Sequence, residues 1–359
     1  MAESSPWTTL HAHIHRILGQ RQLLPRFQRV LVAVSGGQDS LCLAKLLLDL
    51  QPKWGWHLAI AHCDHRWRQD SEANANHVEQ LAKTWQLLFL GQIADRVLKS
   101  EGAAREWRYQ ALSAIAQQHD YPYIVTGHTA SDRAETLLYN LIRGSGADGL
   151  QSLTWQRPLT NEVQLVRPLL ELTRTQTGTF CQEMQLPVWE DSTNQDLKYA
   201  RNRIRHNIIP YLQQHFNPQV EQALAQTAEL LQAEVQYLED AAQQLLQQAT
   251  DQGSRGAGEQ GSRGAEEQRS RGAEENYRSP ITNRLNRLVL RNAPLALQRR
   301  VMRQFLQQAL ASAPSFDQVE KLTALITSPN RSRTDPFPGG AIAEVDGNWI
   351  CFQVKRKME

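Results

Sequence analysis

The chain has 359 residues, of which 41% are hydrophobic and 21% are charged, and its formal net charge is only +2 at pH 7. This length can supply two domains with a core each, and the composition excludes a polycation and favours a globular protein. No segment approaches the roughly 20 apolar residues of a membrane helix, and residues 1–24 lack the order of a secretory signal, so we expect a cytoplasmic protein that makes no membrane contact.

The first part of the chain alternates predicted strands with predicted helices. Residues 1–24 carry apolar residues at helical spacing and predict an N-terminal amphipathic helix. Strands are then predicted at 29–34, 56–62, 87–93 and 123–126, and helices at 40–50, 71–85, 101–119 and 131–142. This alternation indicates βαβ units joined by right-handed crossovers. We therefore expect residues 25–215 to form a doubly wound α/β domain with a parallel sheet, extended near its end by a hairpin that includes residues 163–166.

The second part of the chain has three sections of different composition. Residues 216–250 repeat apolar side chains at intervals of three and four and predict a helical linker. Residues 251–276 contain three copies of an eight-residue repeat without aromatic or β-branched residues, which predicts a disordered insertion; a tether for RNA is the alternative. Residues 277–359 are expected to form a smaller α+β domain with a hairpin turn at Asp346-Gly347.

The strongest local motif is Ser35-Gly36-Gly37-Gln38-Asp39-Ser40, which follows a predicted strand and opens a predicted helix. The first N–H groups of a helix and its positive dipole end bind anions, and the two glycines let the backbone approach phosphate oxygens closely. Asp39 would repel an anion unless Mg²⁺ lies between them. The motif lacks the lysine of GxxxxGK[ST] loops, which disfavours γ-phosphoryl transfer. We predict that these six residues bind ATP phosphates, with a plain strand-to-helix turn as the alternative.

Two carboxylates and two histidines are expected near this loop. Asp132 and Glu135 lie three apart on a predicted helix and share a face, and His128 follows a predicted strand at the same edge of the sheet. We predict that the pair serves an ATP site whose Mg²⁺ is held by Asp39 and Asp132; a solvated acidic face is the alternative. His128 is predicted to donate to a phosphate or a developing oxyanion. His62 ends the second strand and is predicted either to contact the nucleotide or to be structural.

Basic residues in two predicted helical segments suit contacts with phosphates. Arg105 and Arg108 lie three apart on one helical face, which suits a polyphosphate or an RNA backbone, while ion pairs with Glu101 or Glu106 are the alternative. A second basic run fits RNA phosphate contact, or else a solvated helix face, and Asn194 precedes it as a candidate reader of a base edge. The arginines of this run are Arg201, Arg203 and Arg205.

Seven segments keep the order of the motifs of one known family. They are residues 35–40 (SGGQDS), 62–65 (HCDH), 104–109 (AREWRY), 127–136 (GHTASDRAET), 143–150 (RGSGADGL), 167–170 (RPLL) and 191–205 (DSTNQDLKYARNRIR). Together they resemble the tRNA(Ile)-lysidine synthetases, a family within the PP-loop ATP pyrophosphatase superfamily. The sequence departs from the family's pattern at Ser131, which replaces the first acid of an Ala-Asp-Asp segment, and at Arg66-Trp67, where Gly-Leu is usual. The effect of Ser131 on activity stays open.

The resemblance implies a PP-loop fold of the adenine nucleotide alpha-hydrolase type and a defined reaction. The enzyme would adenylate the first anticodon cytidine of tRNA(Ile) with a CAU anticodon and then join free L-lysine to its C2, which changes codon reading from AUG to AUA. ATP and Mg²⁺ are the implied cofactors. The second step needs a carboxylate base, for which Asp64, Asp132 and Glu135 are candidates, and Asp64 and the arginines named above are candidates for tRNA or lysine contacts. The implied catalytic residues are Asp39, His128, Asp132 and Glu135.

The resemblance also leaves alternatives open. Residues 277–359 resemble the family's tRNA-binding domain more loosely, mainly through Pro338-Gly339-Gly340. Another PP-loop tRNA-modifying enzyme is the nearer rival, although the four cysteines contain no CxxC pair for the cluster that 2-thiocytidine synthetases use. The more distant rival is a non-catalytic RNA-binding module with a relict nucleotide site. The oligomeric state is also open, with a homodimer as one alternative.

Overall fold

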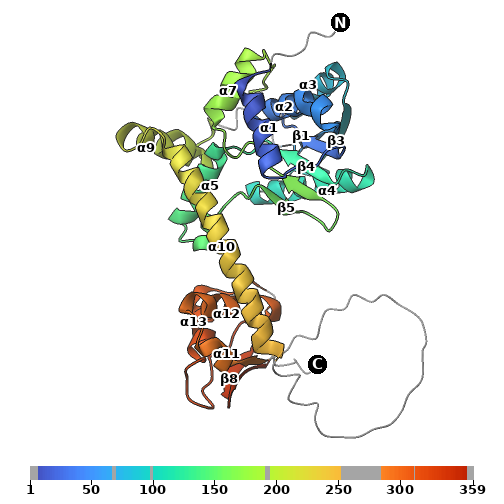
Figure 1. Ribbon diagram of the computed structural model, residues 1–359. Helices are drawn as coiled ribbons and strands as arrows, with labels where there is room; N and C mark the ends of the chain where they lie inside the picture. Colours follow the sequence, from blue (N-terminus) through green and yellow to red (C-terminus); the bar gives the residue numbers. More distant parts are fainter. Residues whose placement is uncertain are drawn as a thin grey trace, which may run out of the picture. The chain divides into compact units, whose positions relative to one another are not determined.

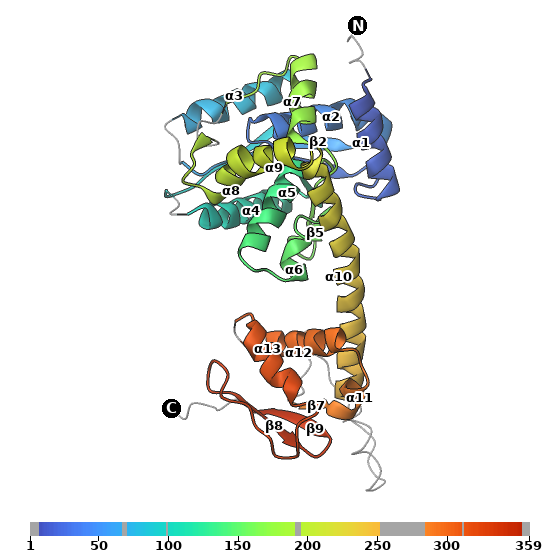
Figure 2. The same ribbon diagram turned by 90° about the vertical axis from the view of Figure 1, so that its left-hand side faces the viewer.

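The computed structural model describes residues 7–66, 70–97, 100–190, 195–251, 284–310 and 312–353. The chain forms two compact units, Met1–Gln232 and Ala233–Glu359, and the ribbon drawings show the elements of each (Figures 1 and 2). The predicted repeat insertion at 251–276 lies outside the described residues, apart from Asp251 at the end of a helix.

The first unit is built on a six-stranded sheet with the strand order β3-β2-β1-β4-β6-β5. Its strands are β1 (Arg29–Ala33), β2 (His57–Asp64), β3 (Leu88–Ile93), β4 (Tyr123–Thr126), β5 (Gln156–Pro158) and β6 (Gln164–Val166). All neighbouring pairs are parallel except β5 with β6, which form the predicted antiparallel hairpin. The predicted doubly wound parallel sheet is confirmed. The chain switches sides between β1 and β4, where the crevices of such sheets bind ligands.

Helices cover both faces of this sheet. The helices of this unit are α1 (Thr9–Gln20), α2 (Gln38–Trp54), α3 (Ser71–Thr84), α4 (Glu101–Gln118), α5 (Ala130–Ile142), α6 (Ala147–Leu150), α7 (Arg174–Glu183), α8 (Ala200–Arg203), a π-helical turn (Ile204–Ile208) and α9 (Ile209–His215). Helix α10 (Val220–Asp251) begins in this unit and ends in the second. Along β1, Val30 and Val32 join the core beneath α1, α2 and α7, whereas Leu31 joins the core beneath α4. Because side chains alternate along a strand, the apolar run of β1 is buried on both sides. Figure 2 shows α2 and α3 on one side of the sheet and α4 on the other.

The second unit has a three-stranded antiparallel sheet with the order β7-β9-β8. Its elements are β7 (Arg284–Asn286), α11 (Arg287–Arg291), α12 (Leu295–Ala309), α13 (Phe316–Ala324), β8 (Ile342–Asp346) and β9 (Trp349–Gln353). The hairpin of β8 and β9 turns at Gly347, whose φ of +56° is favourable for glycine. The predicted smaller α+β fold is therefore confirmed. Among the described residues, no helix combines the length and the apolar character needed to span a membrane.

Candidate active site

The turn between β1 and α2 is a compact loop at the carboxyl edge of the sheet. Gly36 has a φ of +91°, a conformation that favours glycine, and Gly37 caps α2. The Ser40 hydroxyl accepts a hydrogen bond from the Ser35 N–H at 3.1 Å and donates to the Gly37 carbonyl at 2.8 Å. These bonds close the loop on itself, so that the first turn of a long helix is presented at the switch point of the sheet.

Two other segments fix the position of the loop. The Asn74 side chain donates to the carbonyl that precedes Gly36 at 2.9 Å, and the Trp189 N–H donates to the Gly36 carbonyl at 3.0 Å. A Cβ atom on Gly36 would lie 2.3 Å from Oδ1 of Asn74, and one on Gly127 would lie 2.7 Å from the carbonyl oxygen of Asp39. Neither glycine has room for a side chain, so the loop is tightly packed against α3 and the end of β4.

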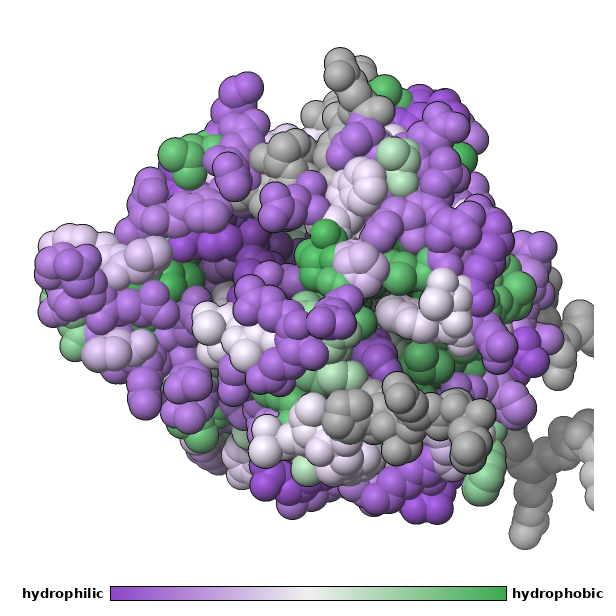
Figure 3. All heavy atoms as spheres, turned by 90° about the horizontal axis from the view of Figure 1, so that it is seen from above, coloured by the Kyte–Doolittle hydropathy of each residue, from purple (hydrophilic) through white to green (hydrophobic). Residues whose placement is uncertain are grey.

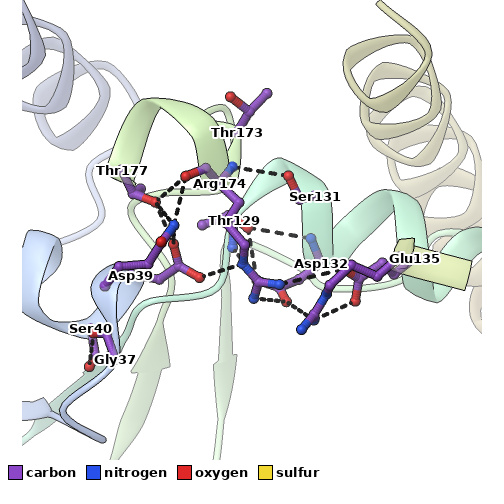
Figure 4. A network of polar contacts seen from close by, with 12 residues as sticks. Gly37, Asp39, Ser40, Thr129, Ser131, Asp132, Glu135, Thr173, Arg174 and Thr177 are labelled. Carbon is purple, nitrogen blue, oxygen red and sulfur yellow. Dashed lines mark hydrogen bonds and ion pairs between the residues drawn. The ribbon is translucent and has the colours of Figure 1, made fainter. Parts of the chain in front are cut away.

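Beside the loop, three carboxylates share two arginines (Figure 4). Arg174 donates from Nε to Asp39 at 3.0 Å and from Nη2 to Asp132 at 3.3 Å, and its Nη1 lies 3.7 Å from Glu135. Arg205 binds Glu135 through two contacts of 2.6 and 2.9 Å. The cluster carries one more negative than positive charge and joins the phosphate loop to the acidic helix α5.

Helix caps position these side chains. The N–H and hydroxyl of Thr129 both donate to Asp132 at 2.8 Å in a capping box, which fixes that carboxylate at the start of α5. Thr173 caps α7 in the same way and places Arg174 at its first position, and Thr177 of α7 donates to Asp39. A cation at a helix N-terminus faces the positive end of the dipole. The repulsion between the Arg174 charge and the positive end of the α7 dipole is therefore offset by the carboxylates around the guanidinium.

Burial and neighbouring charges shift the proton affinities in the cluster. Burial opposes the charged form of Arg174, but Asp132, Asp39 and Glu135 together raise its pKa. Burial is also the main cause of the raised pKa of Glu135, whose side chain is only 2% exposed. Asp132 is half-buried, and although desolvation acts to raise its pKa, the Arg174 charge and the hydrogen bonds from Thr129 leave that pKa lowered.

His128 follows β4 and is influenced by the charges of Asp132 and of the arginines of α4. Burial is the largest cause of its lowered pKa, and the positive charges of Arg167, Arg105 and Arg108 act in the same direction, against Asp132. The imidazole is therefore neutral near pH 7. Its Nδ1 lies 2.9 Å from the hydroxyl of Thr126. If that hydroxyl donates to Nδ1, the ring proton is on Nε2, where it can be donated to a ligand. A neutral ring can still donate to a phosphate oxygen.

His62 and Asp64 are not in the cluster but in a neighbouring cavity of about 760 Å³. Nδ1 of His62 lies 2.8 Å from the carbonyl oxygen of Val34, directly before the loop, and Asp64 accepts from the Arg66 N–H at 2.7 Å. Phe89 supplies apolar surface to the same cavity. The cavity therefore adjoins the phosphate loop on the β2–β3 side of the sheet.

The predicted basic residues have different surroundings. Arg105 and Arg108 are exposed on α4, and within the described part of the chain neither forms the alternative ion pairs with Glu101 or Glu106. Arg203 donates to two carbonyls of its own segment.

Arg201 donates to Thr136 on α5 at 3.3 Å, which brings α8 beside the acidic helix. Arg205 belongs to the carboxylate cluster. Asn194 lies outside the described residues.

Arg174 is the residue that the sequence analysis missed. Its signal was a cation directly after a helix-capping threonine, an electrostatically unfavourable position that points to nearby carboxylates. Ser131 has a distinct place: its hydroxyl accepts from the Arg174 N–H at 3.0 Å and donates to Glu221 at 3.1 Å. The serine thus links α5 to α7 and α10. Over the described ranges, no group of three or more His, Cys, Asp or Glu side chains forms a metal site.

Comparisons with known proteins agree with this architecture. A PP-loop domain family matches residues 8–212, and a family described as the TilS substrate binding domain matches residues 285–348. The chain is 68% identical to a tRNA(Ile)-lysidine synthase of Nostoc sp., covering 97% of each chain, and 48% identical to that of Synechocystis sp., covering 96% of this chain and 98% of the other. The fold is similar to that of a U34-tRNA thiolase from Methanococcus maripaludis, with a TM-score of 0.53 at 16% identity over 62% of this chain and 77% of the other.

Proposed function

The chain belongs to the tRNA(Ile)-lysidine synthase family, as the ordered motifs predicted, and from this premise we propose how it uses ATP to form lysidine on tRNA(Ile). The reaction takes place at the carboxyl edge of the six-stranded sheet. The observation that carries this proposal is the contact of Arg174 with both Asp39 and Asp132, which makes one site of the phosphate loop and the acidic helix.

ATP binds with its phosphates on the loop from Ser35 to Ser40 and its α-phosphorus toward the acidic cluster. The C2 oxygen of the target cytidine attacks this phosphorus, forms a bond to it and releases pyrophosphate. The neutral imidazole of His128 donates a hydrogen bond to the phosphate as charge develops. The ε-amine of lysine then attacks C2, and AMP leaves.

The adenosine end of ATP occupies the cavity beside His62. The cavity has a volume of about 760 Å³, and His62 in its lining contacts the carbonyl oxygen of Val34, the residue directly before the loop. Both observations favour this assignment. Phe89 and Ile93 provide apolar walls for a base, and Asp64 provides an acceptor for a hydroxyl. Asp64 is thereby assigned to nucleotide binding and is the weakest of the three candidates for the base.

Glu135 is the carboxylate that we assign as the base for the lysine amine. Free lysine reaches the site as an ammonium ion, and the excess negative charge of the cluster favours its approach. The raised pKa of Glu135 makes it a better proton acceptor than Asp132, whose pKa is lowered. Two hydrogen bonds from Arg205 hold the Glu135 carboxylate in place.

Mg²⁺ is a further part of the proposal. Asp39 and Asp132 offer carboxylate oxygens, the type of ligand that Mg²⁺ prefers, so their chemistry fits this ion. Arg174 contacts both carboxylates, and Mg²⁺ arriving with ATP would share them with this guanidinium. The ion would neutralise charge on the leaving pyrophosphate.

The second unit is proposed to bind other parts of the tRNA. On helix α12 of this unit, Arg299 is paired with Glu320, and Arg300 and Arg303 are paired with Glu239. Arg291 is exposed at the end of α11 and is the better candidate for a phosphate contact. We further propose that the enzyme acts in the cytoplasm, where tRNA and free lysine occur together.

The mass of a tRNA(Ile) transcript with a CAU anticodon tests this function. After incubation with ATP and lysine, we expect its mass to increase by one lysine residue at the first anticodon position. A transcript that keeps its mass with lysine but gains sulfur when a sulfide donor replaces lysine would identify another PP-loop modifying enzyme. A transcript that binds and keeps its mass would identify a non-catalytic module.

A further inference from the structure

Helix α9 exposes a cluster of aromatic rings that the proposed reaction does not use. Tyr211 is 58% exposed and Phe216, directly after the helix, is 73% exposed. The ring centroids of Tyr211 and His215 are 4.5 Å apart, and those of Tyr211 and Phe216 are 6.1 Å apart. Three rings of one short segment therefore meet at the surface of the first unit.

The opposite face of α9 already anchors the helix. Ile209 is 2% exposed and packs in a small core with Ala134 of α5 and with Ile204. The exposed rings are therefore not needed to fix the helix to the domain. Exposed rings that lie together, and not singly, are suited to an interaction with a partner.

The charges around the cluster select an anionic partner. The preceding segment exposes Lys198 and Arg203. Its other two arginines face acids of the same unit, since Arg205 binds Glu135 and Arg201 lies 4.0 Å from Glu101. Basic residues next to aromatic rings are typical of surfaces that bind single-stranded nucleic acid, where bases stack on the rings and cations contact the phosphates. An apolar protein partner would not require these cations.

The cluster also lies close to the acidic site along the chain. Arg205 binds Glu135, and Tyr211 follows six residues later, which corresponds to roughly 9 Å of helix, while Phe216 corresponds to roughly 16 Å. Figures 1 and 3 show that α9 projects from the body of the first unit, and Figure 3 shows a hydrophilic hollow beside this projection. Nucleotides that flank a base held in the acidic site can reach the rings.

We propose that Tyr211, His215 and Phe216 form a stacking surface for unpaired anticodon-loop bases next to the reacting cytidine. This inference rests on the proposed function and extends it to the recognition of the loop. The guanidinium groups of Arg201 and Arg203 neutralise the intervening phosphates. The rings hold the loop open so that the target base enters the cleft.

Substitutions in the full-length chain test the stacking surface. Tyr211→Ala and Phe216→Ala should each weaken binding of an RNA hairpin with a CAU loop about tenfold, because a base stacked on a ring contributes that much. Tyr211→Phe and Phe216→Tyr keep a ring and should restore affinity, which a loss of fold would not allow. The control is Phe27→Ala. Phe27 is 74% exposed but lies before the amino end of β1, whereas the proposed site is at the carboxyl ends of the parallel strands. It should leave RNA binding unchanged.

An abasic scan of the hairpin loop sharpens the test. At the loop position that stacks on the cluster, removal of the base should weaken binding to the wild type but have little further effect on Phe216→Ala. Alanine variants that bind the hairpin like the wild type would overturn the inference. The inference would also be overturned if the only change in the alanine variants were a smaller sedimentation coefficient. That result would mean that the rings join two copies of the chain. If the wild type itself forms no lysidine, the proposed function fails instead.

Discussion

The guanidinium of Arg174 donates from Nε to Oδ2 of Asp39 at 3.0 Å, across 135 residues of sequence. This contact joins the first residue of α7 to the first turn of α2, directly beside the phosphate loop. Because the same guanidinium also reaches Asp132 and Glu135, it holds together side chains from three helices. Loss of this cation would leave the three carboxylates with Arg205, which contacts Glu135 and Asp132, and would leave Asp39 without its arginine partner.

We therefore expect Arg174→Ala to lower both stability and activity. Removing one partner of a partly buried ion pair costs about 1–3 kcal/mol when water can reach the remaining charges, and lysidine formation should be lost. Arg174→Lys keeps the positive charge but loses the planar guanidinium, whose separate N–H groups face three carboxylates, so it should recover more stability than activity. Urea unfolding and the mass of the tRNA product measure the two effects. If Arg174→Lys recovered lysidine formation to the same extent as it recovered the free energy of unfolding, a role of the guanidinium in the reaction would be contradicted.

Asp39→Asn separates catalysis from RNA binding. The amide keeps the size of the side chain but removes the charge that Arg174 and the proposed Mg²⁺ require. We expect pyrophosphate release to be abolished and affinity for the tRNA transcript to change by less than about twofold, because no RNA contact is assigned to this residue. Turnover that survives in the variant would show that Asp39 has no part in binding the metal.

Gly36→Ala should disturb the phosphate loop specifically. A φ of +91° strains any other residue, and the new Cβ would lie 2.3 Å from Oδ1 of Asn74, so we expect about 1–2 kcal/mol of destabilisation and weaker ATP binding. The matched control is Gly19→Ala in helix α1, where a Cβ meets nothing within 4 Å. That change should stabilise the helix slightly and leave ATP binding intact. Titration of both variants with ATP measures their affinities. Equal ATP affinity of Gly36→Ala and the wild type would contradict the prediction.

The lowered pKa of His128 predicts a specific dependence of stability on pH. The folded protein disfavours the protonated ring, so its pKa falls from 6.5 to about 3, and the contribution of His128 to stability decreases as the pH falls below 6.5. Relative to His128→Gln, the wild type should therefore lose up to about 1 kcal/mol per pH unit between pH 6.5 and pH 5. Urea unfolding at several pH values measures this difference. A constant difference would mean that the ring is not held neutral.

Binding of tRNA should depend steeply on salt. Arginines that contact phosphates release counterions, and a handful of such contacts lowers affinity by more than about tenfold between roughly 50 and 200 mM salt. Arg291→Ala should weaken binding and flatten this dependence. Arg299→Ala, which breaks an internal pair with Glu320, is the control and should leave the slope unchanged. A flat response of the wild type would contradict phosphate contacts altogether.

The sequence predicted the sheet because its signals are local. Short apolar runs, the glycine turn after β1 and the hairpin turn at Gly347 each specify backbone geometry over a few residues. The helical spacing of Asp132 and Glu135 likewise places both on one face of α5, and the parallel sheet brings that helix to the edge where the loop lies.

The partners of these carboxylates could not be predicted in the same way. Arg174 and Arg205 reach the cluster from segments that meet α5 only after the chain has folded. In the second unit, Arg300 likewise pairs with Glu239, which lies 61 residues earlier in the chain. Such pairings depend on tertiary contacts, for which a single sequence carries no local signal.

Transfer of the α-phosphate provides the most direct test that the loop holds ATP with its α-phosphorus open to a nucleophile on RNA. ATP labelled at the α-phosphate would be incubated with the enzyme and the CAU-bearing tRNA(Ile) transcript in the absence of lysine. We predict label covalently attached to the transcript, and its release as AMP when lysine is added. Label that remains in free nucleotide, or transfer of a γ-phosphate label instead, would contradict the account.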